Sequence, residues 1–236
     1  MSDIADTIHK LHTELPPDVT LVAVSKFHPV AAVVEAYQAG QRVFGESRPQ
    51  ELLSKVLALR ESASASGNPE SYSDIRWHFI GHLQTNKLKM VLPYVSMVES
   101  VDSLHLLQAI DRWGSGNGKI TDVLLEYHIA SEETKQGFSA DEIREILFSG
   151  TQYSHVRIRG LMGMATFTDN ESVIREDFSR LVALRDGLLP EAGRHPNLHD
   201  GFGILSFGMT HDYKIAVSMG AGIVRIGTLI FGERNY

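Results

Sequence analysis

One lysine lies where it could act as a nucleophile. Lys26 closely follows the short apolar run Leu21–Val24, so it comes at the carboxyl end of a predicted strand. Burial favours the uncharged form of an amine, and an uncharged lysine amine can form a Schiff base with an aldehyde. The spacing fits a solvated loop lysine equally well, so position alone leaves both interpretations open.

Two segments near the C-terminus carry the groups that a phosphate monoester needs. Hydroxyls and glycines come together in the segment Ser206–Thr210 and again at Gly227 and Thr228. Hydroxyls and unhindered backbone N–H groups bind phosphate well where strands end and helices begin. The alternative is that these glycines only permit tight turns. The sequence therefore predicts a phosphate site at these two segments.

Arg225 interrupts an otherwise apolar strand pattern. Side chains two residues apart share a face of a strand, so Arg225 shares its face with Ile223 and Gly227. If that face lines a barrel, the guanidinium points towards the mouth of the barrel. An unpaired buried charge is costly, so this arginine would need a partner or a ligand. The alternative is an outward arginine that pairs with a glutamate on a helix.

Several other kinds of site fit the sequence less well. The chain has no cysteine, which excludes disulfides and thiolate chemistry. The pairs His78–His82 and His195–His199 have a four-residue spacing, but glycine or proline interrupts each pair, so we predict no metal site. The glycines of Gly220–Gly222 precede their strand, unlike a dinucleotide-binding loop, and the nucleophile elbow of serine hydrolases does not occur.

Charge and hydropathy narrow the classes of partner. The 236 residues include 29 acidic and 22 basic side chains, which gives a net charge of −7 and argues against a nucleic-acid-binding surface. The N-terminus lacks the basic flank and apolar core of a signal peptide, and no apolar stretch of about 18 residues could span a membrane. We therefore expect a cytoplasmic protein that binds a small molecule and neither nucleic acid nor membrane.

Short apolar runs alternate with helical patterns along the chain. Successive runs begin 19 to 47 residues apart, which leaves room for one helix between most neighbouring strands. This alternation predicts parallel strands. The predicted strands are Thr20–Val24, Arg42–Gly45, Ile75–Ile80, Tyr94–Val98, Asp122–Ile129, Val156–Leu161, Gly203–Leu205 and Ile223–Ile226.

Helical periodicity fills most of the gaps between these strands. Ser139 and Glu142 match a capping box at the start of one helix. Polar or glycine-rich composition predicts loops at Glu61–Asp74, Gly114–Lys119 and Pro190–Gly201. The predicted helices are Ile4–Leu15, Val30–Ala39, Pro49–Arg60, Gln84–Val91, Ser103–Trp113, Ala140–Ser149, Ser172–Leu188 and Asp212–Met219.

Eight strands in 236 residues predict an α/β fold, a (β/α)8 TIM-type barrel with an extra N-terminal helix. No change of periodicity or composition follows any of the loops. We therefore expect a single domain over residues 1–236.

Eight motifs in order along nearly the whole chain resemble one known family. On these motifs the chain is similar to the pyridoxal phosphate (PLP) homeostasis protein family, which is related to the N-terminal domain of alanine racemase. The motifs are LVAVSKFHP, FGESRPQEL, WHFIGHLQTNK, SVDSLHLLQAI, SEETKQGF, GLMGMAT, LSFGMTHDY and VRIGTLIFGER.

The resemblance implies a PLP-binding barrel that serves vitamin B6 homeostasis, with PLP-dependent apo-enzymes as candidate recipients of the cofactor. It implies that Lys26 forms the Schiff base with PLP and that Arg225 lies near the pyridine nitrogen. It implies that Ser206, Gly208, Gly227 and Thr228 hold the phosphate. Ser47 stands where the family usually has asparagine, which leaves a cofactor contact there in question, and Phe207 and Thr210 replace the usual methionine and serine.

A PLP-dependent amino-acid racemase is the alternative reading. Racemisation by two bases needs a second acid or base on the opposite face of the cofactor, and only 11 residues follow Arg225. An arginine at the pyridine nitrogen also leaves that nitrogen unprotonated, which weakens the ring as an electron sink. We therefore expect no robust turnover, unless Tyr127 or another group at the barrel mouth supplies the missing base. A phosphate-binding barrel without a Schiff base is the third reading.

Overall fold

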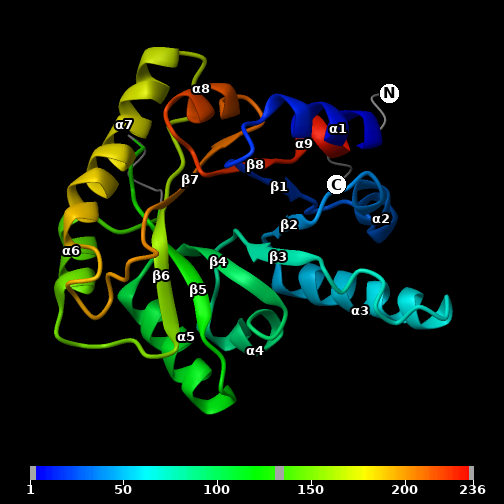
Figure 1. Ribbon diagram of the computed structural model, residues 1–236, viewed down its shortest axis with the longest axis horizontal. Coiled ribbons are helices and arrows are strands. Elements are labelled where there is room, and N and C mark those ends of the chain that lie inside the picture. Colours follow the sequence, from blue (N-terminus) through cyan, green and yellow to red (C-terminus); the bar gives the residue numbers. More distant parts are fainter. Residues whose placement is uncertain (1–3, 131–135, 234–236) are drawn as a thin grey trace.

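The computed structural model describes residues 4–130 and 136–233 (Figure 1). Its strands form one closed barrel in sequence order, and every neighbouring pair is parallel, including β1 with β8. The predicted eight-stranded barrel is thereby confirmed. The strands are β1 Thr20–Val24, β2 Val43–Glu46, β3 Arg76–Phe79, β4 Val95–Val101, β5 Thr121–Glu126, β6 Val156–Met162, β7 Ile204–Met209 and β8 Ile223–Ile226.

Helices surround the barrel and cover its outer face (Figure 1). The predicted extra helix precedes β1, and it contacts the last helix, so the two ends of the described chain lie on the same side. The helices are α1 Ile4–Glu14, α2 Val30–Gln38, α3 Pro49–Ala65, α4 Leu88–Val91, α5 Leu104–Asn117, α6 Ala140–Phe148, α7 Glu171–Leu188, α8 Tyr213–Ser218 and α9 Thr228–Phe231, with 3-10 turns at Thr85–Lys87 and Leu189–Glu191.

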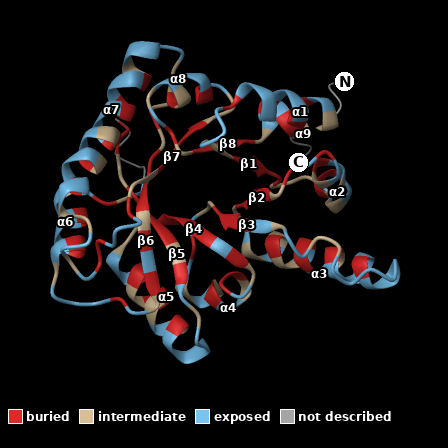
Figure 2. Ribbon diagram, viewed as in Figure 1, coloured by how far each residue is buried: buried red, intermediate tan, exposed pale blue. Residues whose placement is uncertain are grey.

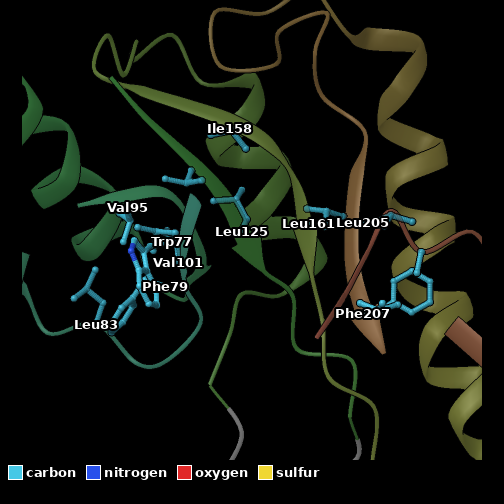
Figure 3. Packing of buried hydrophobic residues seen from close by; sticks show 14 of the residues in the cluster. Trp77, Phe79, Leu83, Val95, Val101, Leu125, Ile158, Leu161, Leu205 and Phe207 are labelled. Carbon is cyan, nitrogen blue, oxygen red and sulfur yellow. The ribbon is translucent and has the colours of Figure 1, made fainter. Parts of the chain in front are cut away.

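Apolar side chains pack in two layers because successive residues of a strand point to opposite faces. The larger layer lies between the strands and the inner faces of the helices. Figure 2 shows these inner faces as buried and the outer faces as exposed. Figure 3 shows part of it, including Phe79, Leu125 and Phe207. The smaller layer fills the barrel interior, and its buried members all come from strands: Val22, Val24, Val43, Met97, Leu124, Met162 and Ile223.

Two helices run further than the sequence pattern predicts. The structure continues α3 through Ala65, and Ala63 near its end is completely buried, so packing extends the helix into the serine-rich stretch. Helix α5 continues to Asn117 and includes Gly114, which packs tightly; a Cβ there would lie 2.5 Å from the carbonyl oxygen of Lys119. The predicted loops therefore begin too early. The capping box of Ser139 and Glu142 at the start of α6 is confirmed.

Strand β7 is longer than predicted, and this changes the position of one candidate residue. The strand continues to Met209, three residues beyond the first predicted phosphate residue, Ser206. Period-two alternation alone did not predict this extension because Ser206 and Gly208 interrupt the apolar run. Strand β5 instead ends early, at Glu126. Within residues 4–130 and 136–233, no helix has the length and apolar character needed to cross a bilayer.

Candidate functional site

Lys26 lies at the mouth of the barrel, on the segment that follows β1. Its side chain is partly exposed. Strand pairing places Ala23 of β1 beside Ile226 of β8, and a Cβ at Gly227 would lie 3.1 Å from the carbonyl oxygen of Val24. The ends of β1 and β8 are therefore packed together, and the lysine shares this part of the rim with the residues after β8.

The ends of β7 and β8 meet at the same part of the rim. The backbone N–H of Gly227 donates a hydrogen bond to Thr210 Oγ1 at 3.4 Å. Thr228 is exposed at the first position of α9. The segments after β1, β7 and β8 thus bring an amine, two hydroxyls and a backbone N–H group to one region.

Gly208 has a packing role that the sequence analysis did not anticipate. Its φ is +92°, a region that favours glycine, and it is buried. A Cβ at this position would lie 2.5 Å from the Cβ of Ala216, which belongs to α8. Glycine therefore allows β7 to approach α8 closely, and a direct contact of Gly208 with phosphate stays a prediction.

Ser206 lies inside the barrel rather than on its rim. Its buried hydroxyl donates a hydrogen bond to Glu99 Oε2 at 2.5 Å and accepts one from Arg225 Nη1 at 2.5 Å. Arg225 Nη2 also donates to the carbonyl oxygen of Gly163 at 3.1 Å, and the residue is 5% exposed. The inward orientation of Arg225 is confirmed, and the outward alternative with a helix glutamate is wrong.

A histidine completes this buried hydrogen-bond network. His78 Nδ1 and Glu99 Oε1 are hydrogen-bonded at 2.6 Å. Burial opposes ionisation of Glu99, but His78, Arg225 and Ser206 together hold its pKa below the usual value. Burial also lowers the pKa of Arg225, against the attraction of nearby carboxylates. These four hydrogen-bonded side chains come from β3, β4, β7 and β8. Together they hold the Arg225 guanidinium in one position.

Glu126 is a further buried carboxyl group at the end of β5. Burial and the nearby Asp102 carboxylate raise its pKa to about 7, although Arg225 and His82 act in the opposite direction. His82 is hydrogen-bonded to Asp102 at 2.8 Å rather than paired with a second histidine. Among the residues that the structure describes, no group of three histidine, aspartate or glutamate side chains could hold a metal ion.

Glu126→Gln is expected to change how stability depends on pH in the cofactor-free protein. The folded-state pKa is raised, so the carboxyl group makes folding less favourable as pH rises from about 4.5 to 7. The loss is at most about 3.5 kcal/mol. Glutamine removes this loss, so the variant should gain stability relative to the parent over that range and keep the gain at pH 8.

Urea unfolding at a series of pH values would measure this difference. Glu145→Gln, an exposed position on α6, is the matched control and should show little change. A difference between Glu126→Gln and the parent that does not vary with pH would contradict the raised pKa.

Ser47 follows β2 at the rim and is partly exposed. A Cβ at Gly81 would lie 2.3 Å from the carbonyl oxygen of Ser47, so glycine is needed where the segments after β2 and β3 touch. The contact of Ser47 with a cofactor stays a prediction. Tyr127, the candidate second base, directly follows β5, is partly exposed and forms an isolated bridge with Phe138.

The sequence analysis did not single out two acidic side chains that face the barrel interior, Glu99 and Glu126, and it considered His78 only as a metal ligand. All three lie within or at the ends of apolar strands. The same signal that drew attention to Arg225, a charged residue within an apolar strand, would have found the two glutamates.

Comparisons with known proteins agree with this geometry. Residues 1–235 match the family model described as alanine racemase, N-terminal domain. A protein of Aquifex aeolicus named pyridoxal phosphate homeostasis protein is 37% identical over 216 residues, which cover 92% of this chain and 87% of that protein. The chain belongs to the pyridoxal phosphate homeostasis protein family. The family identified from the sequence motifs is thereby confirmed.

Solved structures extend the comparison within the family and beyond it. PipY of Synechococcus elongatus, solved without PLP, has a TM-score of 0.84 at 34% identity and covers 97% of this chain and 100% of its own. PipY with PLP bound has a TM-score of 0.81 at the same coverage. An alanine racemase of Clostridium difficile is 13% identical and has a TM-score of 0.70. The match covers 100% of this chain and 57% of the racemase, and it shows only that the two share a fold.

Proposed function

We propose that this protein binds PLP through Lys26 and serves vitamin B6 homeostasis. The observation that carries the proposal is the shared position of Lys26 with Thr210, Gly227 and Thr228 at the ends of β1, β7 and β8. PLP has an aldehyde and a phosphate, so it needs an amine and a set of phosphate donors in one place. Supporting this, the similar protein PipY has been solved with PLP bound.

The donors at the β7 and β8 ends fit a phosphate monoester. Thr228 offers an exposed hydroxyl, and Gly227 is partly exposed and has no side chain to block a ligand, although its N–H group donates a 3.4 Å hydrogen bond to Thr210 Oγ1 in this structure. Thr210 supplies a second hydroxyl beside Gly227. Gly208 contributes by letting β7 pack closely on α8. Ser206 contributes through Arg225, because its hydroxyl is already bonded to Arg225 and Glu99.

Arg225 decides what kind of chemistry the bound cofactor supports. PLP supplies an electrophilic aldehyde and an electron-withdrawing ring, and the ring withdraws electrons best when its nitrogen is protonated. Arginine donates hydrogen bonds and cannot accept them, so a pyridine nitrogen that faces Arg225 stays unprotonated. Ser206 and Glu99 hold the guanidinium in that position. This arrangement favours holding the cofactor over turning over amino acids, with PLP-dependent apo-enzymes as the proposed recipients.

Absorbance of the protein incubated with PLP, before and after borohydride reduction, tests the proposal. We expect a reducible bond, and peptide mapping should place the reduced adduct on Lys26. Adducts found only on Lys55, on Lys87, or on Lys135, which lies outside the described residues, would contradict it. Bound PLP with no reducible bond would support the reading as a plain phosphate-binding barrel. A single domain over residues 1–236 and a cytoplasmic location stay predictions from the sequence.

Thr228→Val is expected to weaken PLP binding by about 1–3 kcal/mol, because the bound phosphate loses a hydroxyl donor to a charged acceptor. Valine is nearly the same size, so the backbone should be unaffected. Equilibrium titration with PLP measures the change. Thr151→Val, at an exposed position before β6, is the matched control. Unchanged affinity in Thr228→Val would rule out the Thr228 hydroxyl as a phosphate donor and leave Thr210 and the backbone N–H groups.

A further inference from the structure

A buried lysine lies directly beneath the segment that carries Lys26. Lys55, on α3, is 3% exposed. Its Nζ donates hydrogen bonds to the carbonyl oxygen of Ser25 at 2.7 Å, to Glu46 Oε1 at 2.6 Å and to Glu51 Oε1 at 2.8 Å. An ammonium group has three N–H donors, so these bonds use all of them. Lys55 is thereby tied into the structure rather than offered to a ligand.

The same two carboxylates hold the chain on both sides of the reactive lysine. On one side, the Ser25 hydroxyl donates to Glu46 Oε1 at 2.6 Å. On the other side, the backbone N–H of Phe27 donates to Glu51 Oε1 at 2.5 Å. These bonds, together with the one from Lys55 to the Ser25 carbonyl, fix the residues that immediately precede and follow Lys26.

Phe27 adopts a backbone conformation that requires such support. Its φ is +68°, in the left-handed region, which bulky residues rarely adopt because it is strained. Glu51 holds its N–H group, and the guanidinium of Arg48 lies 4.3 Å from the centre of its ring. Strained backbone of this kind persists only where the surroundings enforce it.

Stability alone does not explain why ions are buried at this place. Glu46 is completely buried, and its Oε2 has no hydrogen-bond partner. Burial raises the pKa of Glu46, while Lys55 and Ser25 act against that rise. Buried ion pairs contribute little net stability compared with well-packed apolar side chains, because removing the charges from water is costly. A positional role accounts for the network better than a stabilising one.

We propose that Lys55, Glu46 and Glu51 are positioning residues that aim Lys26 at the aldehyde of PLP. This inference rests on the proposed function. In the covalent step, Lys26 Nζ forms a C=N bond with the aldehyde carbon, and the aldehyde oxygen leaves with the two amine hydrogens as one water molecule. The three residues take no part in that exchange. They limit movement of the Lys26 backbone, so that the amine is held near its target.

The test follows the rate at which a borohydride-reducible adduct appears after the protein is mixed with PLP. Glu51→Ala and Lys55→Met should slow this rate by about tenfold or more, because a small displacement of a reacting group has large effects. Non-covalent retention of PLP through the phosphate should change much less. Glu51→Gln should recover most of the rate, because its amide oxygen can still accept the Phe27 N–H.

Glu61→Ala is the matched control, because it removes an exposed glutamate from the same helix. Its adduct rate should equal that of the parent. Urea unfolding identifies variants that fail to fold. If Lys55→Met fails to fold, the comparison of Glu51→Ala with Glu51→Gln still tests the positioning role. The Glu51 side chain is 20% exposed, so it is easier to replace without unfolding the protein.

The outcomes separate this inference from the proposed function. A parent protein that forms no adduct at Lys26 would contradict the proposed function itself. A parent that reacts normally, with a folded Glu51→Ala variant reacting at the same rate, would overturn only the positioning role. Equal losses of adduct rate and of non-covalent PLP retention would also overturn it, because they would indicate general damage to the site.

Discussion

Replacing Lys26 by alanine is expected to abolish covalent attachment of PLP while leaving the protein folded. Lys26 is partly exposed at the rim and belongs to neither cluster of buried apolar residues, so the free energy of unfolding should change by less than about 1 kcal/mol. The phosphate donors after β7 and β8 remain, and some non-covalent binding should persist. The mass of the borohydride-reduced protein and its absorbance with PLP measure the covalent loss, and urea unfolding measures stability.

Lys89→Ala, an exposed lysine on α4, is the control and should keep the adduct. A reduced adduct of unchanged yield in Lys26→Ala would contradict the assignment. The same pair of proteins separates the two readings of function in deuterated water with common amino acids. Rapid exchange of the α-proton with inversion, lost in Lys26→Ala, would favour the racemase.

Replacing Arg225 by methionine is expected to destabilise the cofactor-free protein by about 3–5 kcal/mol, because it leaves buried carboxyl groups without their cation. Arg225 lowers the pKa of both Glu99 and Glu126. Without it the folded variant holds these protons more tightly than the folded parent does. The stability lost should therefore be larger at pH 8 than at pH 5. Urea unfolding at the two pH values would measure the difference.

A surface arginine and a double variant serve as controls for this result. Arg175→Met removes an exposed arginine on α7 and should change stability by less than about 0.5 kcal/mol. Adding Glu99→Gln to Arg225→Met removes the uncompensated carboxylate and should restore part of the loss. No recovery in the double variant would show that Arg225 stabilises the barrel by packing rather than through Glu99.

The reactive lysine and the inward arginine could be predicted from the sequence because each depends on local order along the chain. Lys26 follows an apolar run, and a residue that follows a barrel strand lies at the mouth. The face of Arg225 follows from period-two alternation within β8. Ser206 was misplaced because the length of β7 depends on pairing with its neighbours rather than on its own composition.

Apolar periodicity was enough to predict the order of strands and helices, the barrel and the position of Lys26, since it records which face of each element is buried. Which distant side chains meet could be seen only in the folded structure. Glu99 reaches Ser206, 107 residues away, and Lys55 reaches the carbonyl of Ser25, 30 residues away. Such contacts depend on strand register, on barrel closure and on the packing of α3 against β2 and the segment that follows β1. Periodicity shows the face on which a residue lies, but it does not show which residue lies opposite.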